Sequence, residues 1–548
     1  MSDIAPLNES SLLRAKVFSP QLLILISIIL RGVIYFFSLY PNEIQSVSPT
    51  DRLYYEALRY HFFEYLWYTT NIPPVTHIIN AIVFVFFKPE IAYGKFIFLI
   101  VTFILDILSL FLLFSASCKF GITRKVSFFL ALFYSFTIIP FEVWRFGSLY
   151  DHHSLFFTSL YIYAISLFYS DKRLRSAALM SLAGGLMIAQ SSISSVVVPM
   201  TSLFIVVLLN IKLKGKDLIK RIGIVLIGPV AILLLISTKN YMVADTFATS
   251  TKSGPAMMMF VRRALGRDNV RIEKLLREAG APGWYIDCFN SAVIPPDLKP
   301  ENPNFKGWLN LSRDFGICFP WTNIEADTWP YDFGPLLALI RKYNEPYIER
   351  KIIEDIDDMH KRKYLFAGYS PELSPRWIGI YGSISMQMGK WLLLHKPFTY
   401  FKNALRTQGL FFVRGTSFFR ITLYTNKKPH SLSTLSSPIH GEMLFYVVTT
   451  IFEWAARVIY ILMFAYAALI SWKIVRNLIN NRAYRLPHDY HVFLIMALPA
   501  ILLSLMFSMT ADVENDRYFV QITPYLVLCA GYFASAFIEK IRVKHLFT

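Results

Sequence analysis

The sequence predicts an all-α membrane protein whose chain crosses the bilayer many times. Of its 548 residues, 55% are hydrophobic and 16% are aromatic. Only 17% are charged, whereas about a quarter of the residues of a soluble globular protein are charged. Apolar stretches of about 20 residues, the length that an α-helix needs to cross a bilayer, recur along the chain. We therefore expect one membrane body with large loops attached to it.

About ten stretches are long and apolar enough to span the bilayer. They lie at residues 21–40, 95–115, 125–141, 152–169, 174–191, 194–210, 221–238, 443–470, 491–509 and 518–538. The first run follows Arg14 and Lys16, is too long for a signal-peptide core and lacks a small-residue cleavage site. We expect it to be retained as the first membrane helix.

The run Thr76–Phe87 is ambiguous because it is short and is bounded by prolines on both sides. If it does not span, the basic clusters of alternate loops share the cytoplasmic side, as the positive-inside rule requires. These clusters are Lys119/Arg124/Lys125, Lys172/Arg173/Arg175, Lys212/Lys214/Lys216/Lys220/Arg221, Lys473/Arg476/Arg482/Arg485 and Lys540/Arg542/Lys544. We therefore predict that residues 55–88 form two helices in the outer membrane interface.

The formal net charge of +18 is explained by the same pattern. Binding to nucleic acid needs basic residues gathered on one stripe or groove, whereas here they sit in short clusters between apolar runs. The positive charge therefore reflects how the chain is oriented in the membrane. We expect membrane lipids but no nucleic acid among the partners.

Residues 239–442 fall on the outer side and are too long a connection to be a simple loop. The segments Met257–Ala279 and Gly334–Lys363 look helical, and Gly389–Phe412, interrupted by charges and a proline, is predicted as an interfacial helix. The expected organisation is a transmembrane catalytic module (1–238), a mixed extracytoplasmic lid domain (239–442) and C-terminal transmembrane helices (443–548). The lid contains two of the four cysteines, Cys288 and Cys318. They form either a disulfide or two unpaired thiols, and the sequence favours neither.

Asp51 begins the segment Asp51-Arg52-Leu53-Tyr54-Tyr55-Glu56 in the first outer loop. A carboxylate at the membrane boundary can act as a general base. The alternative is a helix N-cap, because Ser48-Pro49-Thr50-Asp51 is typical of a helix start.

Tyr150-Asp151-His152-His153 stands at the mouth of the fourth span, where polar groups must face protein or water. Asp151 and His153 can supply two metal ligands from one turn. The alternative is a helix cap with a hydrogen-bonded neighbour.

The segment Asp512–Tyr518 precedes the last span, and its Arg517 is a planar, permanently charged donor that suits a lipid phosphate. Pairing with neighbouring acids, or anchoring beside Tyr518, is the alternative. Asp106 lies in mid-span, where it is either a functional group or a polar contact between helices.

The order of these segments resembles the GT-C glycosyltransferases, in particular the branch of protein O-mannosyltransferases and the bacterial aminoarabinose transferase of lipid A. In that branch the first outer loop carries an acidic residue, a Tyr-rich interfacial helix and a Pro-Pro-Leu-like entry to a second helix. Here these are Asp51, Tyr54–Trp67 and Pro73-Pro74-Val75. A pattern like Arg-x-x-x-x-Asp-x-x-Leu-x-x-Phe is approximated by Arg145, Asp151, Ser154-Leu155-Phe156 and Tyr161, with Arg145 one residue further from the aspartate.

The resemblance continues to the end of the chain, although each motif is short. Lys239-Asn240-Tyr241 is similar to the Arg-Asn-Tyr that precedes the outer domain in bacterial relatives, and residues 515–524 are similar to their Glu-x-Arg-Tyr-x-x-Pro-x-x-Pro. Asp51-Arg52 departs from the Asp-Glu pair of many relatives. His152-His153 resembles the Asp-His-His of archaeal oligosaccharyltransferases, which helps to bind a divalent cation, but their Trp-Trp-Asp signature is absent.

The resemblance implies a GT-C fold and inverting transfer of a sugar from a polyprenyl-phosphate donor to a lipid, glycan or protein acceptor. It makes Asp51 and Asp151 the catalytic candidates, with Arg517 stabilising the leaving phosphate. A divalent cation (manganese, magnesium or zinc) bound by Asp151 and His153 is the expected cofactor. The other residues expected at the substrate are Tyr54, Tyr55, Arg145 and Glu514. The expected location is the bacterial inner membrane, or the endoplasmic reticulum membrane in a eukaryote.

Two other classes of membrane protein remain as alternatives. A transporter or lipid-linked-sugar flippase would show repeated halves with interrupted helices near the midplane, and no such repeat is visible in the sequence. A membrane scaffold would keep its function after loss of the outer polar clusters.

Overall fold

The computed structural model describes residues 18–38, 49–70, 74–87, 94–144, 149–210, 215–290 without 252 and 267, 334–361, 375–414, 439–479, 488–510 and 515–546. These residues are helical apart from turns and short connections, and no strand occurs among them.

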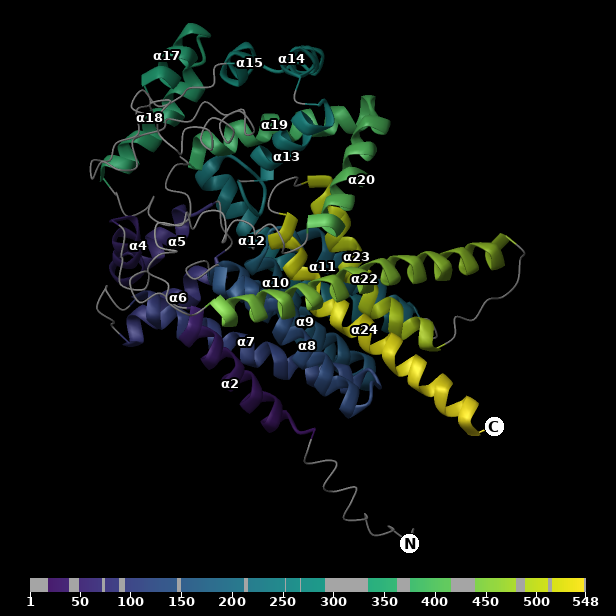
Figure 1. Cartoon of the computed structure of the whole chain (residues 1–548). Helices are drawn as coiled ribbons and strands as arrows, with labels where there is room; N and C mark the ends of the chain where they lie inside the picture. Colours follow the sequence, from purple (N-terminus) through teal and green to yellow (C-terminus); the bar gives the residue numbers. More distant parts are fainter. Residues whose placement is uncertain are drawn as a thin grey trace.

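Ten helices form a bundle (Figure 1). They are α2 (Pro20–Ser38), α7 (Gly94–Lys119), α8 (Arg124–Trp144), α9 (Leu149–Asp171), α10 (Leu174–Gln190), α11 (Ser194–Leu209), α12 (Gly215–Ala244), α22 (Ile439–Ile479), α23 (His488–Thr510) and α24 (Asn515–Leu546). Among the described residues, five helical segments are long and apolar enough to cross a membrane: Ile100–Lys119, Gly215–Ala244, Trp454–Arg476, Tyr490–Met509 and Gln521–Ile538. The chain is therefore a helical membrane protein, as the sequence predicted.

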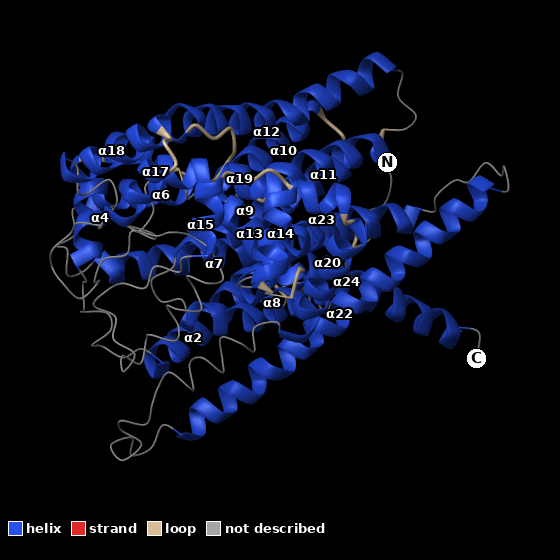
Figure 2. Cartoon of the chain, turned by 90° about the horizontal axis from the view of Figure 1, so that it is seen from above, coloured by secondary structure: helices blue, strands red, loops and turns tan. Residues whose placement is uncertain are grey.

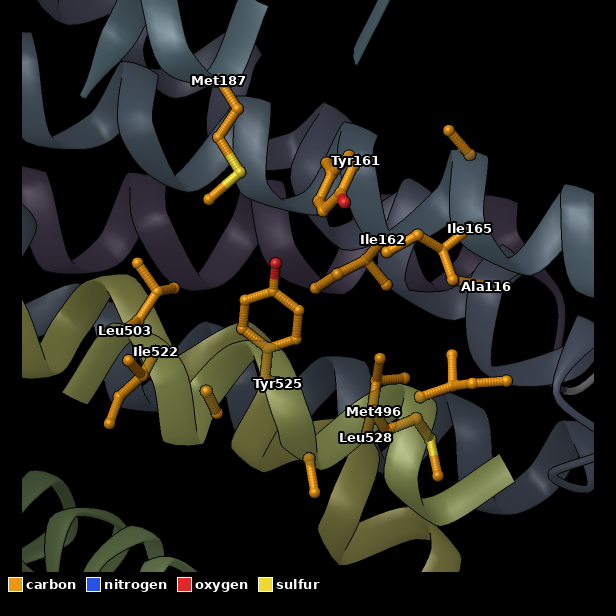
Figure 3. Packing of buried hydrophobic residues seen from close by; sticks show 14 of the residues in the cluster. Ala116, Tyr161, Ile162, Ile165, Met187, Met496, Leu503, Ile522, Tyr525 and Leu528 are labelled. Carbon is orange, nitrogen blue, oxygen red and sulfur yellow. The ribbon is translucent and has the colours of Figure 1, made fainter. Parts of the chain in front are cut away.

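One apolar core joins the helices before residue 240 to those after residue 450. Tyr525 of α24 lies at its centre and points toward α9, where Tyr161 and Ile162 lie (Figure 3). The Tyr161 hydroxyl donates to the carbonyl oxygen of Val198 on α11 at 3.4 Å and lies 2.6 Å from Ser202 Oγ on the same helix. The two ends of the chain thus pack as parts of one bundle.

Basic turns gather at one end of this bundle. Arg124 Nε, at the start of α8, donates to the carbonyl oxygen of Phe18 at 2.9 Å, and the ring of Phe120 lies 5.5 Å from that of Tyr169. The start of α2, the α7–α8 turn and the end of α9 therefore lie together. We call this the basic end; its cations include Lys119, Arg124, Lys125, Arg173 and Arg175.

The remaining helices cover the opposite end of the bundle, as Figures 1 and 2 show. We call them the cap: α13 (Ser253–Ala264), α14 (Asn269–Glu278), α15 (Gly283–Asn290), α17 (Gly334–Lys342), α18 (Pro346–Lys361), α19 (Pro375–His395) and α20 (Pro397–Arg414), with α4 (Pro49–Tyr60), α5 (Phe62–Tyr68) and α6 (Val75–Phe87) beside them. A second core fills this layer, in which Tyr285 stacks on Tyr381 with ring centroids 4.7 Å apart. Cys288 of α15 is disulfide-bonded, whereas Cys118 and Cys529 are free thiols.

Two predicted cap helices are each divided in the structure. The segment Met257–Ala279 breaks because Gly266 adopts a left-handed φ of 75° and Asp268 then caps α14, accepting from the Val270 amide at 3.0 Å. The segment Gly334–Lys363 breaks at Asn344, whose φ is 53°, before Pro346 starts α18.

Two predicted interfacial regions also differ from expectation. Gly389–Phe412 is not one helix, because α19 ends at His395 and Pro397 starts α20. Residues 55–88 form three helices rather than two, since His61 leaves the helical conformation, with a φ of −132°, between α4 and α5.

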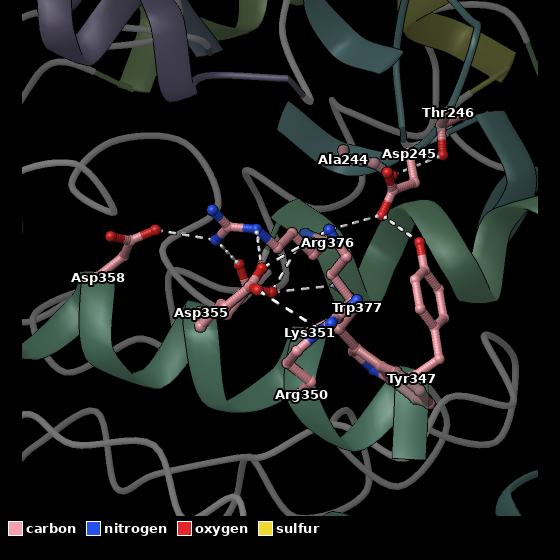
Figure 4. Close-up of polar contacts among 11 residues, drawn as sticks. Ala244, Asp245, Thr246, Tyr347, Arg350, Lys351, Asp355, Asp358, Arg376 and Trp377 are labelled. Atoms are coloured by element: carbon pink, nitrogen blue, oxygen red, sulfur yellow. Dashed lines mark hydrogen bonds and ion pairs between the residues drawn. The ribbon is translucent and has the colours of Figure 1, made fainter. Parts of the chain in front are cut away.

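Asp245 joins the cap to the bundle at the end of α12. Its φ of 52° ends that helix, and its carboxylate accepts from the Tyr347 hydroxyl at 2.8 Å and pairs with Lys351 Nζ at 3.2 Å (Figure 4). Both partners belong to α18. The cap is therefore attached to a membrane helix by direct polar contacts.

Candidate functional site

Three of the charged residues singled out in the sequence lie in the first turns of helices at the cap end. Asp51, Asp151 and Arg517 are each the third residue of α4, α9 and α24, respectively. Their side chains lie outside the described part of the structure, and Arg145 and Glu514 lie outside it altogether. Because α4 begins at Pro49, Asp51 is inside the first turn and is not the N-cap that was the alternative. Negative charge in a first turn is stabilised by the helix dipole.

A buried hydrogen-bonded chain joins α4 to α6. The Tyr54 hydroxyl lies 3.0 Å from His77 Nδ1, and Asn80 Nδ2 donates to the same hydroxyl oxygen at 3.0 Å. Tyr54 stands three residues after Asp51, and residues three apart share a helix face. The start of α4, which carries Asp51, is thus fixed against α6.

A second set of contacts joins α6 to α9 and α10. Thr76 Oγ1 lies 3.1 Å from His153 Nδ1 and accepts from Gln190 Nε2 at 2.9 Å. Gln190 Nε2 also lies 3.4 Å from Ser154 Oγ. His153 stands two residues after Asp151, so the start of α9 is fixed against the same helix. We call the whole set the α6 network: Tyr54, Thr76, His77, Asn80, His153, Ser154 and Gln190.

His77 is neutral within this network. Burial, followed by the positive charge of Lys239, lowers the pKa of His77 from 6.5 to about 3. Asn80 Nδ2 donates to the Tyr54 oxygen, and the Tyr54 hydroxyl and His77 Nδ1 share one proton, donated by whichever of the two carries it in the imidazole tautomer present. No described residue accepts a hydrogen bond from His77 Nε2.

Lys239 secures the neighbouring helix α5. Its Nζ donates to the carbonyl oxygens of Leu66 at 3.2 Å and Thr69 at 2.5 Å, at the C-terminal end of α5. A cation there satisfies carbonyl groups that the helix leaves unpaired and complements its dipole. Lys239 opens the Lys239-Asn240-Tyr241 motif, and the structure shows that it holds α5 against α12.

The two tyrosines expected at the substrate are both buried. Tyr54 is 6% exposed and belongs to the α6 network, while Tyr55 is 3% exposed and stacks on Phe84 with ring centroids 4.8 Å apart. Tyr54 therefore acts on α6, and Tyr55 packs in the cap core.

The expected metal ligand His153 is fully buried, and its Nδ1 faces Thr76. The described part of the chain contains no group of three His, Cys, Asp or Glu side chains that could hold a metal ion. The carboxylates expected beside His153, those of Asp51 and Asp151, are outside that part. A metal bound by His153 would use Nε2.

Sequence reasoning missed the central position of α6, which was treated as a plain interfacial helix. Its signal was Thr76, His77 and Asn80, polar residues that share one face of an otherwise apolar helix. Gln190, 114 residues away from Thr76, ends an apolar span and carried no recognisable motif.

Comparisons with protein-family models, with curated proteins and with solved structures find no match to this chain.

Proposed function

We propose that this protein is a membrane glycosyltransferase of the GT-C type. It transfers a sugar from a polyprenyl-phosphate donor to a hydroxyl group of an acceptor, with inversion at the anomeric carbon, at the membrane face covered by the cap. The observation that carries the proposal is the α6 network, which ties the helix starts bearing Asp51 and Asp151 to one helix. The first turns of α4 and α9 are thereby both attached to α6.

In this proposal Asp51 is the general base. The acceptor hydroxyl attacks the anomeric carbon and loses its proton to the Asp51 carboxylate, while the bond to the donor phosphate breaks and its electron pair leaves with the phosphate. Arg517, at the start of α24, stabilises the charge that the phosphate gathers. Tyr54 and His77 act as positioning residues, because their hydrogen bond holds α4, which carries Asp51, against α6.

Sidedness is proposed from two features of the described structure. Cys288 of the cap is disulfide-bonded, and disulfides persist in oxidising compartments such as the periplasm or the endoplasmic reticulum lumen. The basic end lies opposite, as expected for the cytoplasmic side. We accordingly propose about ten spans, with the cap outside the cytoplasm and the protein in a bacterial inner membrane, or in the endoplasmic reticulum membrane of a eukaryote.

We further propose a divalent cation at the start of α9, bound by Asp151 and by Nε2 of His153. A cation there would supply positive charge to the donor phosphate. The imidazole favours manganese or zinc, and carboxylate oxygens also accept magnesium. Exhaustive chelation should then stop turnover, and manganese should restore it.

The test is incubation of the purified full-length protein with radiolabelled polyprenyl-phosphate sugars and candidate acceptors. Asp51→Asn should lower turnover by at least about a hundredfold, because it keeps the side-chain shape and removes the base. Glu56→Gln is the matched control, since Glu56 is an exposed acid on the same helix. Its turnover should be unchanged.

Undiminished turnover in Asp51→Asn would remove Asp51 from the mechanism. Transbilayer movement of the intact lipid-linked sugar, without transfer of the sugar to any acceptor, would instead identify a flippase.

A further inference from the structure

One face of α20 combines exposed apolar side chains with cations. Phe398, Phe401 and Leu405 are 80%, 48% and 71% exposed, respectively, and their spacing places them on one side of the helix. Lys402 and Arg406 are exposed and follow Phe401 and Leu405 directly in the sequence. We call these residues the α20 face.

Tyr400 and Gln408 fix α20 against the bundle. The Tyr400 hydroxyl donates to the carbonyl oxygen of Met509 at 2.8 Å. Two turns later, Gln408 Nε2 donates to Ser504 Oγ at 3.3 Å and also hydrogen bonds with the Tyr460 hydroxyl. The helix is therefore held in one orientation, and its exposed face is a stable surface.

These contacts place α20 at the membrane boundary. Met509 is the last residue of the span Tyr490–Met509, and Ser504 lies roughly 7 to 8 Å further into it along the helix axis. Lys402 and Arg406 fall between Tyr400 and Gln408 in the sequence. The cations of the α20 face thus lie near the end of a span, at the depth where lipid phosphates occur.

The charge of this face is not neutralised by the described protein. Helix α20 contains no Asp or Glu, and no described carboxylate pairs with Lys402 or Arg406. Lys396, just before the helix, differs, because it pairs with Glu278 at 3.7 Å. The α20 face therefore presents uncompensated positive charge beside an apolar surface.

We propose that the α20 face binds an anionic phospholipid of the membrane leaflet at the cap end. Lys402 and Arg406 pair with the headgroup phosphate, while Phe398, Phe401 and Leu405 contact the acyl chains. A second copy of the chain is a poorer occupant, because a twofold interface would bring these cations close to their own copies. The inference does not depend on the proposed glycosyltransferase activity.

The test uses the full-length protein in detergent micelles with a fluorophore on Leu405→Cys, in a chain whose accessible native thiol is removed by Cys118→Ser. Phosphatidylglycerol and phosphatidylcholine with brominated acyl chains are titrated as quenchers. Phosphatidylglycerol should quench at the lower concentration. Lys402→Gln/Arg406→Gln should raise the concentration required by about tenfold or more and remove the preference.

Matched variants separate this site from general charge effects. Lys361→Gln/Lys390→Gln removes two exposed cap cations elsewhere and should leave the preference intact. Lys402→Arg/Arg406→Lys keeps the charge and should also retain it. Equal quenching by both lipids, or an unchanged preference in Lys402→Gln/Arg406→Gln, would overturn the proposal. So would protection of the fluorophore from both lipids together with a dimer in sedimentation, because a second copy would then occupy the face.

Discussion

Tyr54 and His77 share a buried hydrogen bond of 3.0 Å that joins the first cap helix to α6. Asn80 donates to the same phenolic oxygen, so one hydroxyl group serves two side chains of α6 at once. Both contacts lie in the interior of the protein, where an unmet polar group is costly. One phenolic oxygen therefore links α4, which begins near Asp51, to two side chains of α6.

We predict that Tyr54→Phe destabilises the folded protein by about 1 to 3 kcal/mol, because it leaves polar atoms of His77 and Asn80 buried without their partner. The measurement is the thermal unfolding midpoint of the purified protein in detergent. Tyr60→Phe is the control, since Tyr60 is 67% exposed on the same helix. Equal midpoints for the two variants would show that the hydrogen bonds of Tyr54 contribute nothing to stability.

The low pKa of His77 predicts a loss of stability in mild acid. In the unfolded chain His77 takes up a proton below its ordinary pKa of 6.5, whereas in the folded protein it stays neutral down to about 3. Between these values the unfolded state binds the extra proton, so the free energy of unfolding falls as the pH falls, by about 1.4 kcal/mol per pH unit.

This pH dependence is measured as the unfolding midpoint at several values between pH 7.5 and pH 5. His77→Phe should start from a lower midpoint, because Tyr54 loses its hydrogen-bond partner on α6, but should decline less steeply with acid. His395→Gln, which changes an exposed histidine, should follow the native slope. A slope in His77→Phe as steep as in the native chain would assign the acid sensitivity to other groups.

The membrane helices could be predicted from the sequence because their length and composition follow from the bilayer. The predicted spans 221–238 and 491–509 correspond to Gly215–Ala244 and Tyr490–Met509, two segments long and apolar enough to cross a membrane. The bounds of the cap helices were harder to predict, because the amphipathic pattern of the sequence continues across positions where a single residue ends the helix. Gly266 and Asn344 both adopt left-handed conformations and end helices. Glycine and asparagine are local signs of a break, but the apolar pattern around them favoured one continuous helix in each case.

The candidate site could be predicted only in part. Asp51 and Asp151 stood out because charged residues beside apolar spans are conspicuous. Thr76 and Gln190 did not stand out, because a contact between residues 114 positions apart depends on how helices pack, which one sequence does not reveal. His77 was overlooked for a related reason, since an isolated histidine within an apolar run has no motif around it.

Asp355 and Arg376 form a second polar contact within the cap (Figure 4). Asp355 is fully buried; one carboxylate oxygen pairs with Arg376 Nη1 at 2.8 Å, and the other accepts from the backbone amides of Arg376 at 3.1 Å and Trp377 at 3.2 Å. The carboxylate of α18 thus satisfies amide groups at the start of α19 that the helix itself leaves unpaired.

We predict that Asp355→Leu destabilises the cap by about 3 to 5 kcal/mol, because it leaves the buried side of Arg376 and the start of α19 without an acceptor. Asp358→Asn is the control; Asp358 also pairs with Arg376, at 2.9 Å, but is partly exposed and should cost about 0 to 1 kcal/mol. Unfolding midpoints of the two variants check the difference. If Asp358→Asn lowered the unfolding midpoint more than Asp355→Leu, the stabilising partner of Arg376 would be Asp358 rather than Asp355.

Helices α10 and α12 approach each other closely at Gly228. Its backbone amide donates to Ser181 Oγ at 2.8 Å, and a Cβ added there would collide with the backbone of Ser181. Gly185, one turn further along α10, faces the same point, since a Cβ on it would lie 3.2 Å from the Gly228 carbonyl oxygen. Small residues of this kind allow the backbones of two membrane helices to come into contact.

We predict that Gly228→Ala destabilises the protein by about 1 to 3 kcal/mol, because the added methyl group meets backbone atoms that cannot rotate away and must push α10 from α12. Gly223→Ala on the same helix is the matched control, since a Cβ there meets nothing within 4 Å. That control should be neutral or stabilising by up to about 1 kcal/mol, because alanine has the higher helix propensity. Both variants add one methyl group to α12, so only the Ser181 contact distinguishes them. The thermal unfolding midpoints of both variants are measured in the same detergent. Equal midpoints would mean that α10 and α12 can move apart at Gly228 without loss of stability.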